Sequence, residues 1–241
     1  MSLFFSERVR AALAPSRYLA LPLAGIDLST SGVKAVRLAE DARGLTLASY
    51  EATFFPSGVF ADGEVIDRSA VVDAIVATAK KVGISAMNGA LSESKSYLFE
   101  TTVEGDSKAQ WRIALEQHLD ELIPLPPSDT AFDFVSIGQD AQGGARIAGI
   151  GFARRIVDDT LSVFDQAGIA VRSLEGETSA MARALLPIGD TSTALIIDVG
   201  KTTTKLAITT NRIPRFATTI GIGGHALTLA VQKHFGVTET E

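Results

Sequence analysis

Apolar residues near the start of the chain follow the period of strands and are interrupted by polar turns. An apolar segment at residues 18–26 leads into a first turn, a strand follows at residues 34–38, and another strand covers residues 45–55. Between residues 71 and 82 the apolar positions recur at helical spacing instead. Asp67 or Ser69 can cap this helix, and Gly83 can end it.

The rest of the chain continues to alternate between the two patterns. Ser107 and Gln110 form a capping box, and the helix that follows carries an apolar stripe from Trp111 to Leu122. Further strands are predicted at residues 86–91, 94–103, 132–137, 145–152, 170–174, 206–210 and 215–220, and further helices at residues 155–167, 177–186 and 226–235. Strands and helices that alternate in this way predict an α/β fold.

Composition narrows the classes of function. Of the 241 residues, 46% are hydrophobic and 21% are charged, which is typical of a folded globular protein. The net charge of −6 gives no general attraction for nucleic acid, and the absence of cysteine excludes disulfides and thiolate metal sites. No apolar run reaches the ~18 residues of a transmembrane helix. The histidines at 118, 225 and 234 are scattered without carboxylates at ligand spacing, so they predict no metal site.

Two segments of the chain repeat the same pattern. In each, an apolar run ends in an aspartate, Asp27 or Asp198, and a turn rich in glycine and hydroxyl groups follows. A lysine stands seven positions after each aspartate, Lys34 or Lys205, and a second apolar run then begins. We call residues 27–34 the first Asp turn and residues 198–205 the second Asp turn. Each is predicted to join two neighbouring strands.

The residues of these turns suit a phosphate ligand. Small residues let the backbone approach closely, so that N–H groups and hydroxyls converge on an anion. An aspartate beside phosphate is favourable when Mg²⁺ and its bound waters lie between them. Two ordinary β-hairpins with polar loops would explain one such turn, but the repeat favours a pair of turns that hold a polyphosphate.

Two other segments resemble nucleotide-binding motifs. Gly200-Lys201-Thr202 resembles the end of a Walker A loop, but Leu195 stands where that loop needs glycine, and a strand rather than a helix follows. Gly221-x-Gly223-x-x-Ala226 matches a dinucleotide fingerprint between a strand and a helix, but no acidic residue ending a further strand follows it. This fingerprint is kept only as a minor alternative.

Several segments in a fixed order resemble the actin-like ATPase superfamily. Within it the chain is most similar to the PilM family of type IV pilus assembly proteins, whose near relatives are the FtsA division proteins. The matching segments are residues 25–36 and 198–204, which resemble the two phosphate segments, and residues 58–67, 123–126, 153–169 and 220–224. The order of the segments, rather than any one of them, carries the resemblance.

The resemblance implies an actin-like (ribonuclease-H-like) α/β fold with an inserted SHS2-type 1C subdomain and an incomplete second lobe. Family members continue beyond this length with a segment that holds the adenosine, and we expect that segment to be absent here. The implied divisions are an N-terminal lead at 1–23, subdomain 1A at 24–85 and 169–190, subdomain 1C at 86–168, and the start of subdomain 2A at 191–241.

The resemblance also implies a function. It predicts a cytoplasmic ATP-binding scaffold of the type IV pilus inner-membrane assembly platform, associated peripherally with the membrane through its partners. Those partners are the N-terminus of a PilN-like membrane protein and other platform proteins, without nucleic acid; self-association stays open. The alternatives are a nucleotide-free actin-like interaction module, as in GspL of secretion platforms or in FtsA, and an ASKHA-type kinase.

The matched segments assign binding residues for ATP or ADP and Mg²⁺. Asp27 and Asp198 would hold the metal through water, and Glu177 would place an acidic group near the nucleotide. Ser29 stands where the family usually has glycine, and its Cβ narrows the approach of a phosphate. At most a slow Mg-ATPase is expected, and no catalytic base is identified. The nucleotide-binding residues expected from the resemblance are Asp27, Ser29, Thr30, Ser31, Gly32, Lys34, Glu177, Asp198, Gly200, Thr202, Thr203 and Thr204.

Overall fold

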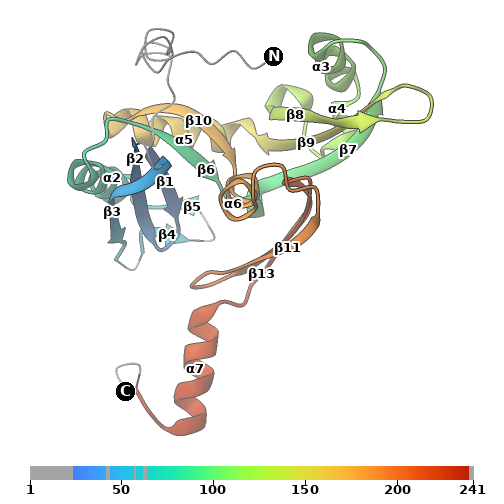
Figure 1. Ribbon diagram of the computed structural model, residues 1–241. Helices are drawn as coiled ribbons and strands as arrows, with labels where there is room; N and C mark the ends of the chain where they lie inside the picture. Colours follow the sequence, from blue (N-terminus) through green and yellow to red (C-terminus); the bar gives the residue numbers. More distant parts are fainter. Residues whose placement is uncertain (1–23, 42–43, 57, 62–63, 239–241) are drawn as a thin grey trace.

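The computed structural model describes residues 24–41, 44–56, 58–61 and 64–238 (Figure 1). The predicted N-terminal lead, residues 1–23, lies outside the described residues. The strands are β1 Ala24–Ser29, β2 Gly32–Asp41, β3 Gly44–Phe54, β4 Phe60–Ala61, β5 Glu64–Val65, β6 Ala86–Leu91, β7 Ser96–Val103, β8 Thr130–Gln139, β9 Ala145–Ala153, β10 Ala170–Gly176, β11 Thr193–Val199, β12 Thr204–Thr210 and β13 Ile213–Ile220.

The helices alternate with these strands as the sequence predicts. They are α2 Arg68–Val82, α3 Lys108–Gln117, α4 Leu119–Leu122, α5 Arg154–Gln166, α6 Glu177–Leu185 and α7 Gly224–Phe235, with short 3-10 turns η1 Glu93–Lys95 and η2 Pro127–Asp129. None of the helices in the described part of the chain has the length and apolar character needed to cross a bilayer.

A five-stranded sheet forms the first lobe, in the order β10-β6-β1-β2-β3. Strand β1 pairs antiparallel with β2 and parallel with β6, and β6 pairs parallel with β10. The carboxyl ends of β1, β6 and β10 therefore lie at one edge of this sheet. In open α/β sheets, ligands bind outside this edge.

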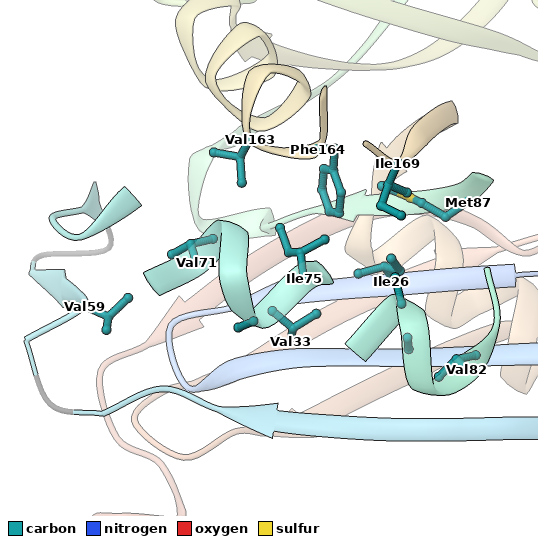
Figure 2. Packing of buried hydrophobic residues seen from close by; sticks show 13 residues of the cluster. Ile26, Val33, Val59, Val71, Ile75, Val82, Met87, Val163, Phe164 and Ile169 are labelled. Carbon is teal, nitrogen blue, oxygen red and sulfur yellow. The ribbon is translucent and has the colours of Figure 1, made fainter. Parts of the chain in front are cut away.

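Helices α2 and α5 supply the main core of this lobe. Asp67 caps α2 by accepting a hydrogen bond from the Ala70 N–H (3.0 Å), and Gly83 ends the helix in the left-handed conformation, as predicted. Figure 2 shows buried side chains of α2 and α5 packing together above the strands. The labelled members are Ile26, Val33, Val59, Val71, Ile75, Val82, Met87, Val163, Phe164 and Ile169.

A second, three-stranded sheet in the order β7-β9-β8 carries its own core against α3 and α4. The chain order of strand, helices, strand, strand is that of an SHS2-type insert. The prediction of one continuous helix after Ser107 is wrong. The backbone of His118 leaves helical geometry and separates α3 from α4. Ser107 does cap α3, but Gln110 Oε1 accepts from the Asp106 N–H rather than from Ser107.

The predicted insert, residues 86–168, includes two elements that belong elsewhere. Strand β6 pairs within the five-stranded sheet, and Val163 and Phe164 of α5 are buried in the core of that sheet. We therefore propose that the inserted unit covers residues 92–153 and that α5 belongs to the first lobe.

The last part of the described chain forms an antiparallel sheet in the order β11-β12-β13, followed by α7. Asn211 and Arg212 both have positive φ (54° and 63°), as a two-residue hairpin turn requires. Helix α6 contacts β6 and β10 of the first sheet and β13 of this one. It thus connects the two lobes, and Figure 1 shows α7 extending from the far side of the β11–β13 sheet.

Candidate functional site

The first Asp turn is a tight hairpin between β1 and β2. Ser29 pairs with Gly32, so Thr30 and Ser31 alone form the turn, and Asp27 stands opposite Lys34. The Lys34 Nζ lies 3.4 Å from Asp27 Oδ2, with 52% of the lysine side chain and 39% of the aspartate side chain exposed. The spacing of seven residues seen in the sequence is therefore a cross-strand pair.

The backbone around this turn is tightly packed. Gly32 has φ +156°, and a Cβ there would come within 2.3 Å of the Thr53 carbonyl oxygen. The Ser29 hydroxyl lies 3.0 Å from the Ser31 hydroxyl and donates to the Gly32 carbonyl (3.3 Å). The side chain of Ser29 is thus directed to its own turn, and its hydroxyl is already hydrogen-bonded there.

The second Asp turn has the same register with a longer loop. Asp198 stands opposite Lys205, and the Gly200 N–H donates to the Thr203 carbonyl (2.9 Å). Within the described ranges, the N–H groups of residues 201–203 donate no hydrogen bond, and the half-buried carboxylate of Asp198 has no hydrogen-bond or ion-pair partner. Free N–H groups beside a free carboxylate can serve a phosphate with its metal ion.

Helix α7 begins against this second turn. The Gly224 N–H donates to the Gly200 carbonyl (2.8 Å), and the His225 N–H donates to the Lys201 carbonyl (2.9 Å). A Cβ at Gly223 would lie 2.6 Å from the Gly200 carbonyl oxygen. The interpretation of residues 221–226 as a dinucleotide-binding motif is therefore wrong. The N–H groups that would bind a diphosphate already donate to carbonyl groups of the turn.

Lys205 does not pair with Asp198 but with Glu177 at the start of α6. The Lys205 Nζ lies 2.5 Å from Glu177 Oε2, and each side chain is only 16% exposed. The Glu93 N–H donates to the same Oε2 atom (3.4 Å). Glu177 therefore receives a cation from the second lobe and a backbone N–H from the entrance of the insert.

Glu93 completes this cluster and is only 6% exposed. Its carboxylate accepts hydrogen bonds from the Thr178 N–H (3.1 Å) and from the Ser96 hydroxyl (3.2 Å). Glu93 was not predicted, since one glutamate in a polar loop carries no motif. Lys205 belongs to the repeat but is not among the predicted binding residues.

Other ion pairs hold α6 in place. Arg183 of α6 forms paired hydrogen bonds with Glu175 of β10, and these bonds raise the pKa of the Arg183 guanidinium above its ordinary value. The Arg212 guanidinium donates to the Arg183 carbonyl (2.8 Å). The position of Glu177 is thus fixed from both lobes.

Strand register relates the two turns to each other. Asp27 pairs with Ala90, and Ala90 pairs with Glu175, so these three residues lie side by side near the carboxyl edge of the first sheet. Neighbouring strands are about 4.8 Å apart, which places Asp27 and Glu175 about 10 Å apart across the sheet. Glu177 follows at this edge and contacts Lys205 of the second turn. The structure thus brings the second Asp turn to the edge at which the first one lies.

The predicted metal ligands were Asp27 and Asp198, acting through water. The described residues contain no group of three or more acidic or histidine side chains that could hold a metal alone. Mg²⁺ bound by phosphates and waters takes only one or two carboxylates, so single carboxylates on the two turns suit it. The residues present therefore fit the phosphate half of a magnesium nucleotide.

A pocket of about 290 Å³ opens at the same edge, between the first sheet and α5. Its apolar wall includes Leu28, Leu91 and Ile156, and Ser92 and Lys95 of the η1 region form another wall. The full lining is Leu28, Val65, Arg68, Ala90, Leu91, Ser92, Lys95, Arg155, Ile156, Asp159, Thr160 and Val163. The charged members are three basic residues and one acid, so the pocket suits an apolar segment that carries hydrogen-bond acceptors.

Comparisons with known proteins agree with this architecture. The family model of the type IV pilus assembly protein PilM matches residues 25–241. A solved PilM-PilN type IV pilus biogenesis complex superposes with a TM-score of 0.74 at 17% identity, covering 91% of this chain and 67% of that one.

Two other solved structures share the fold. The cytoplasmic domain of EpsL, an inner-membrane component of the type II secretion system of Vibrio cholerae, has a TM-score of 0.55 at 14% identity over 90% of this chain and 78% of that one. The ethanolamine utilization protein EutJ from Carboxydothermus hydrogenoformans has a TM-score of 0.52 at 16% identity, over 93% and 62%. Identities at this level show the shared actin-like fold alone.

Proposed function

The chain belongs to the PilM family of type IV pilus assembly proteins, and from this premise we propose that it is a nucleotide-binding scaffold of the pilus assembly platform. In this proposal Mg-ATP or Mg-ADP binds at the two Asp turns, and the N-terminus of a PilN-like membrane protein binds in the pocket beside α5. The protein would act in the cytoplasm, held at the inner membrane through its partners.

One observation carries the nucleotide part of the proposal. Lys205 reaches from the second Asp turn to Glu177 at the carboxyl edge of the first sheet, where Asp27 also lies. Two turns with the same register thus lie on two lobes that meet at this edge. A ligand with several phosphates can contact both lobes there at once.

In this proposal, different residues of the two turns contact the phosphates and the water bound to the metal ion. The N–H groups of residues 201–203 donate to phosphate oxygens, and Lys34 and Thr30 approach from the first turn. Asp198, which has no partner among the described residues, would accept hydrogen bonds from water bound to the metal ion. The magnesium ion, when bound, neutralises phosphate charge. The Ser29 hydroxyl is engaged within its own turn, so this turn contributes less than one with glycine would.

The pocket beside α5 suits the partner peptide. It is formed by the first lobe, including α5, and by η1 at the entrance of the insert. The solved complex named PilM-PilN superposes on this chain and supports a partner of that kind. An extended apolar peptide would place its side chains on Leu91 and Ile156.

Binding of the peptide can be tested directly. A labelled peptide with the sequence of the cytoplasmic N-terminus of a PilN-like protein is titrated into the chain, and fluorescence anisotropy is recorded. Ile156→Glu places a charge in the apolar wall and should weaken binding at least about tenfold. Ile113→Glu is the matched control, because Ile113 is an exposed residue of α3 that does not line the pocket. Equal binding by wild type and Ile156→Glu would contradict the assignment of the pocket.

A nucleotide-free interaction module is the second candidate. Both lysines of the two turns already contact carboxylates, Lys34 with Asp27 and Lys205 with Glu177. These pairs let both turns stay folded without an anion. In this alternative the peptide binds as above, and Mg-ATP gives no heat in calorimetry.

A further inference from the structure

A buried polar cluster joins the second Asp turn to the wall of the peptide pocket. Lys205 contacts Glu177 (2.5 Å), and Glu177 accepts the N–H of Glu93 (3.4 Å). The Glu93 carboxylate in turn accepts hydrogen bonds from the Thr178 N–H and from the Ser96 hydroxyl. The contacts connect β12 of the second lobe, α6 of the first lobe and η1 at the start of the insert.

The η1 turn is itself part of the pocket. Ser92 and Lys95, on either side of Glu93 and Ser94, line it together with Leu91 at the end of β6. Glu93 points the other way, into the cluster with α6, and is almost fully buried. Whatever fixes the side chain of Glu93 therefore also fixes one wall of the pocket.

We propose that Lys205 is a positioning residue that, through Glu177 and Glu93, holds η1 in place as the wall of the peptide pocket. The proposal rests on the proposed function in one respect, namely that the pocket binds a peptide. Its structural part, the control of η1 by a lysine on the second Asp turn, stands without any ligand.

The charges of the cluster explain why a lysine is needed. Glu93 and Glu177 are two carboxylates that share the first turn of α6, and the N-terminal N–H groups of this helix offset only part of their repulsion. Lys205 supplies a full positive charge to Glu177 where little water reaches. Without Lys205, the repulsion between the two carboxylates is no longer offset, and η1 moves away from α6.

An anion bound at the second Asp turn would also loosen η1 from α6, but less than the loss of Lys205 would. A phosphate that attracts the Lys205 ammonium draws it away from Glu177, so the hold on η1 weakens. Because binding coupling is reciprocal, a peptide that fixes η1 in another position would change the affinity for the anion by the same factor.

Amide hydrogen exchange of the ligand-free chain tests the structural part. In Lys205→Met, the amides of residues 92–98 should exchange at least about tenfold faster than in wild type, because the contacts that close this segment are weakened. Glu177→Gln removes the uncompensated charge, so the double variant Lys205→Met/Glu177→Gln should recover most of the lost protection. A lysine that merely packs would show no such recovery.

The matched control is Lys81→Met. Lys81 pairs with Glu51 (3.3 Å) on α2 and β3, away from η1, and its loss should leave exchange at residues 92–98 unchanged. If Lys205→Met exchanges like wild type at these residues, or if the double variant exchanges as fast as Lys205→Met, the positioning role is overturned.

Peptide affinity gives the second readout. With the labelled PilN-like peptide, Lys205→Met should change the dissociation constant at least about threefold, while Lys81→Met should not. A wild-type chain that binds no peptide would refute the proposed function and leave the exchange result to decide the role of Lys205. Altered exchange with unaltered peptide affinity would refute control of the pocket.

Discussion

The two Asp turns share one sequence pattern and one register but differ in the partners of their lysines. In the first turn, Lys34 contacts the aspartate opposite it, Asp27, and the side chains of the two residues are 52% and 39% exposed. In the second turn, Lys205 leaves Asp198 free and instead contacts Glu177, 28 residues earlier, in a largely buried pair. A repeat in sequence has thus become two different electrostatic environments.

The difference follows from what each hairpin packs against. The first hairpin continues into β3 of its own sheet, and its aspartate and lysine face solvent together. The second hairpin packs on α6 through the buried cluster of Ala182, Ile196 and Ala207. The N-terminus of α6 presents Glu177, which attracts the lysine. Local sequence therefore sets the register of a turn, whereas its charge pairing depends on the neighbouring element.

Backbone crowding at the first turn should give the largest effect. Gly32→Ala would place a Cβ 2.3 Å from the Thr53 carbonyl oxygen at a φ that suits glycine, so β2 and β3 must separate locally. We expect the free energy of unfolding to fall by about 3 kcal/mol in urea denaturation. Gly25→Ala, whose Cβ would meet Val36 at an ordinary 3.7 Å, is the control. Equal stability of the two variants would contradict the packing described here.

The lysines of the two turns should differ in their contribution to stability. Lys205→Met leaves Glu177 buried without its cation and should lower the free energy of unfolding by about 2 to 3 kcal/mol. Lys34→Met removes an exposed pair and should change it by less than about 0.5 kcal/mol. Urea midpoints of both variants measure the contrast. If the two losses are alike, the environments do not differ as described.

The anchoring of the second turn by α7 can be tested with glycines. A Cβ at Gly223 would press on the carbonyl oxygens of Gly200 and Lys201, so Gly223→Ala should cost about 1 to 2 kcal/mol, measured by thermal unfolding. Gly221→Ala is the matched control, since nothing lies within 4 Å of its Cβ position. A larger loss in Gly221→Ala than in Gly223→Ala would contradict the contact.

Salt should produce the smallest of these effects. A double-mutant cycle on Lys34 and Asp27 should give a coupling energy below about 0.5 kcal/mol that vanishes in 0.5 M NaCl, because both groups are exposed to screening ions. The cycle on Lys205 and Glu177 should retain most of its coupling at that salt concentration. The reverse pattern would mean that the assignment of exposed and buried pairs is wrong.

Much of the fold follows from local sequence rules. The hairpins at both Asp turns, the cap at Asp67 and the helix end at Gly83 are confirmed where they were predicted. These features depend on residues that are only a few positions apart, so they can be read from the sequence itself. The family resemblance added the insert, and the three-stranded sheet β7-β9-β8 with its own core lies within the residues predicted for it; its bounds stay a proposal.

Other features depend on contacts between distant residues. The strand β6 could not be assigned to the first sheet from its own sequence, because pairing with β1 and β10 joins segments about 60 to 80 residues away. Glu93 gave no signal, since its role comes from the N-terminus of α6, more than 80 residues later. The assignment of nucleotide binding to the two turns stays a prediction, because only the binding of a nucleotide would test it.

The central claim is that the two Asp turns bind one magnesium nucleotide. Isothermal titration of Mg-ATP into the wild-type chain, Asp27→Ala, Asp198→Ala and the control Asp73→Ala tests it most directly. Asp73 is an exposed residue of α2 outside the turns. We predict heat of binding for wild type and Asp73→Ala, and at least about tenfold weaker binding for each of the other two. No heat with wild type, or equal affinity in all four proteins, would contradict the claim.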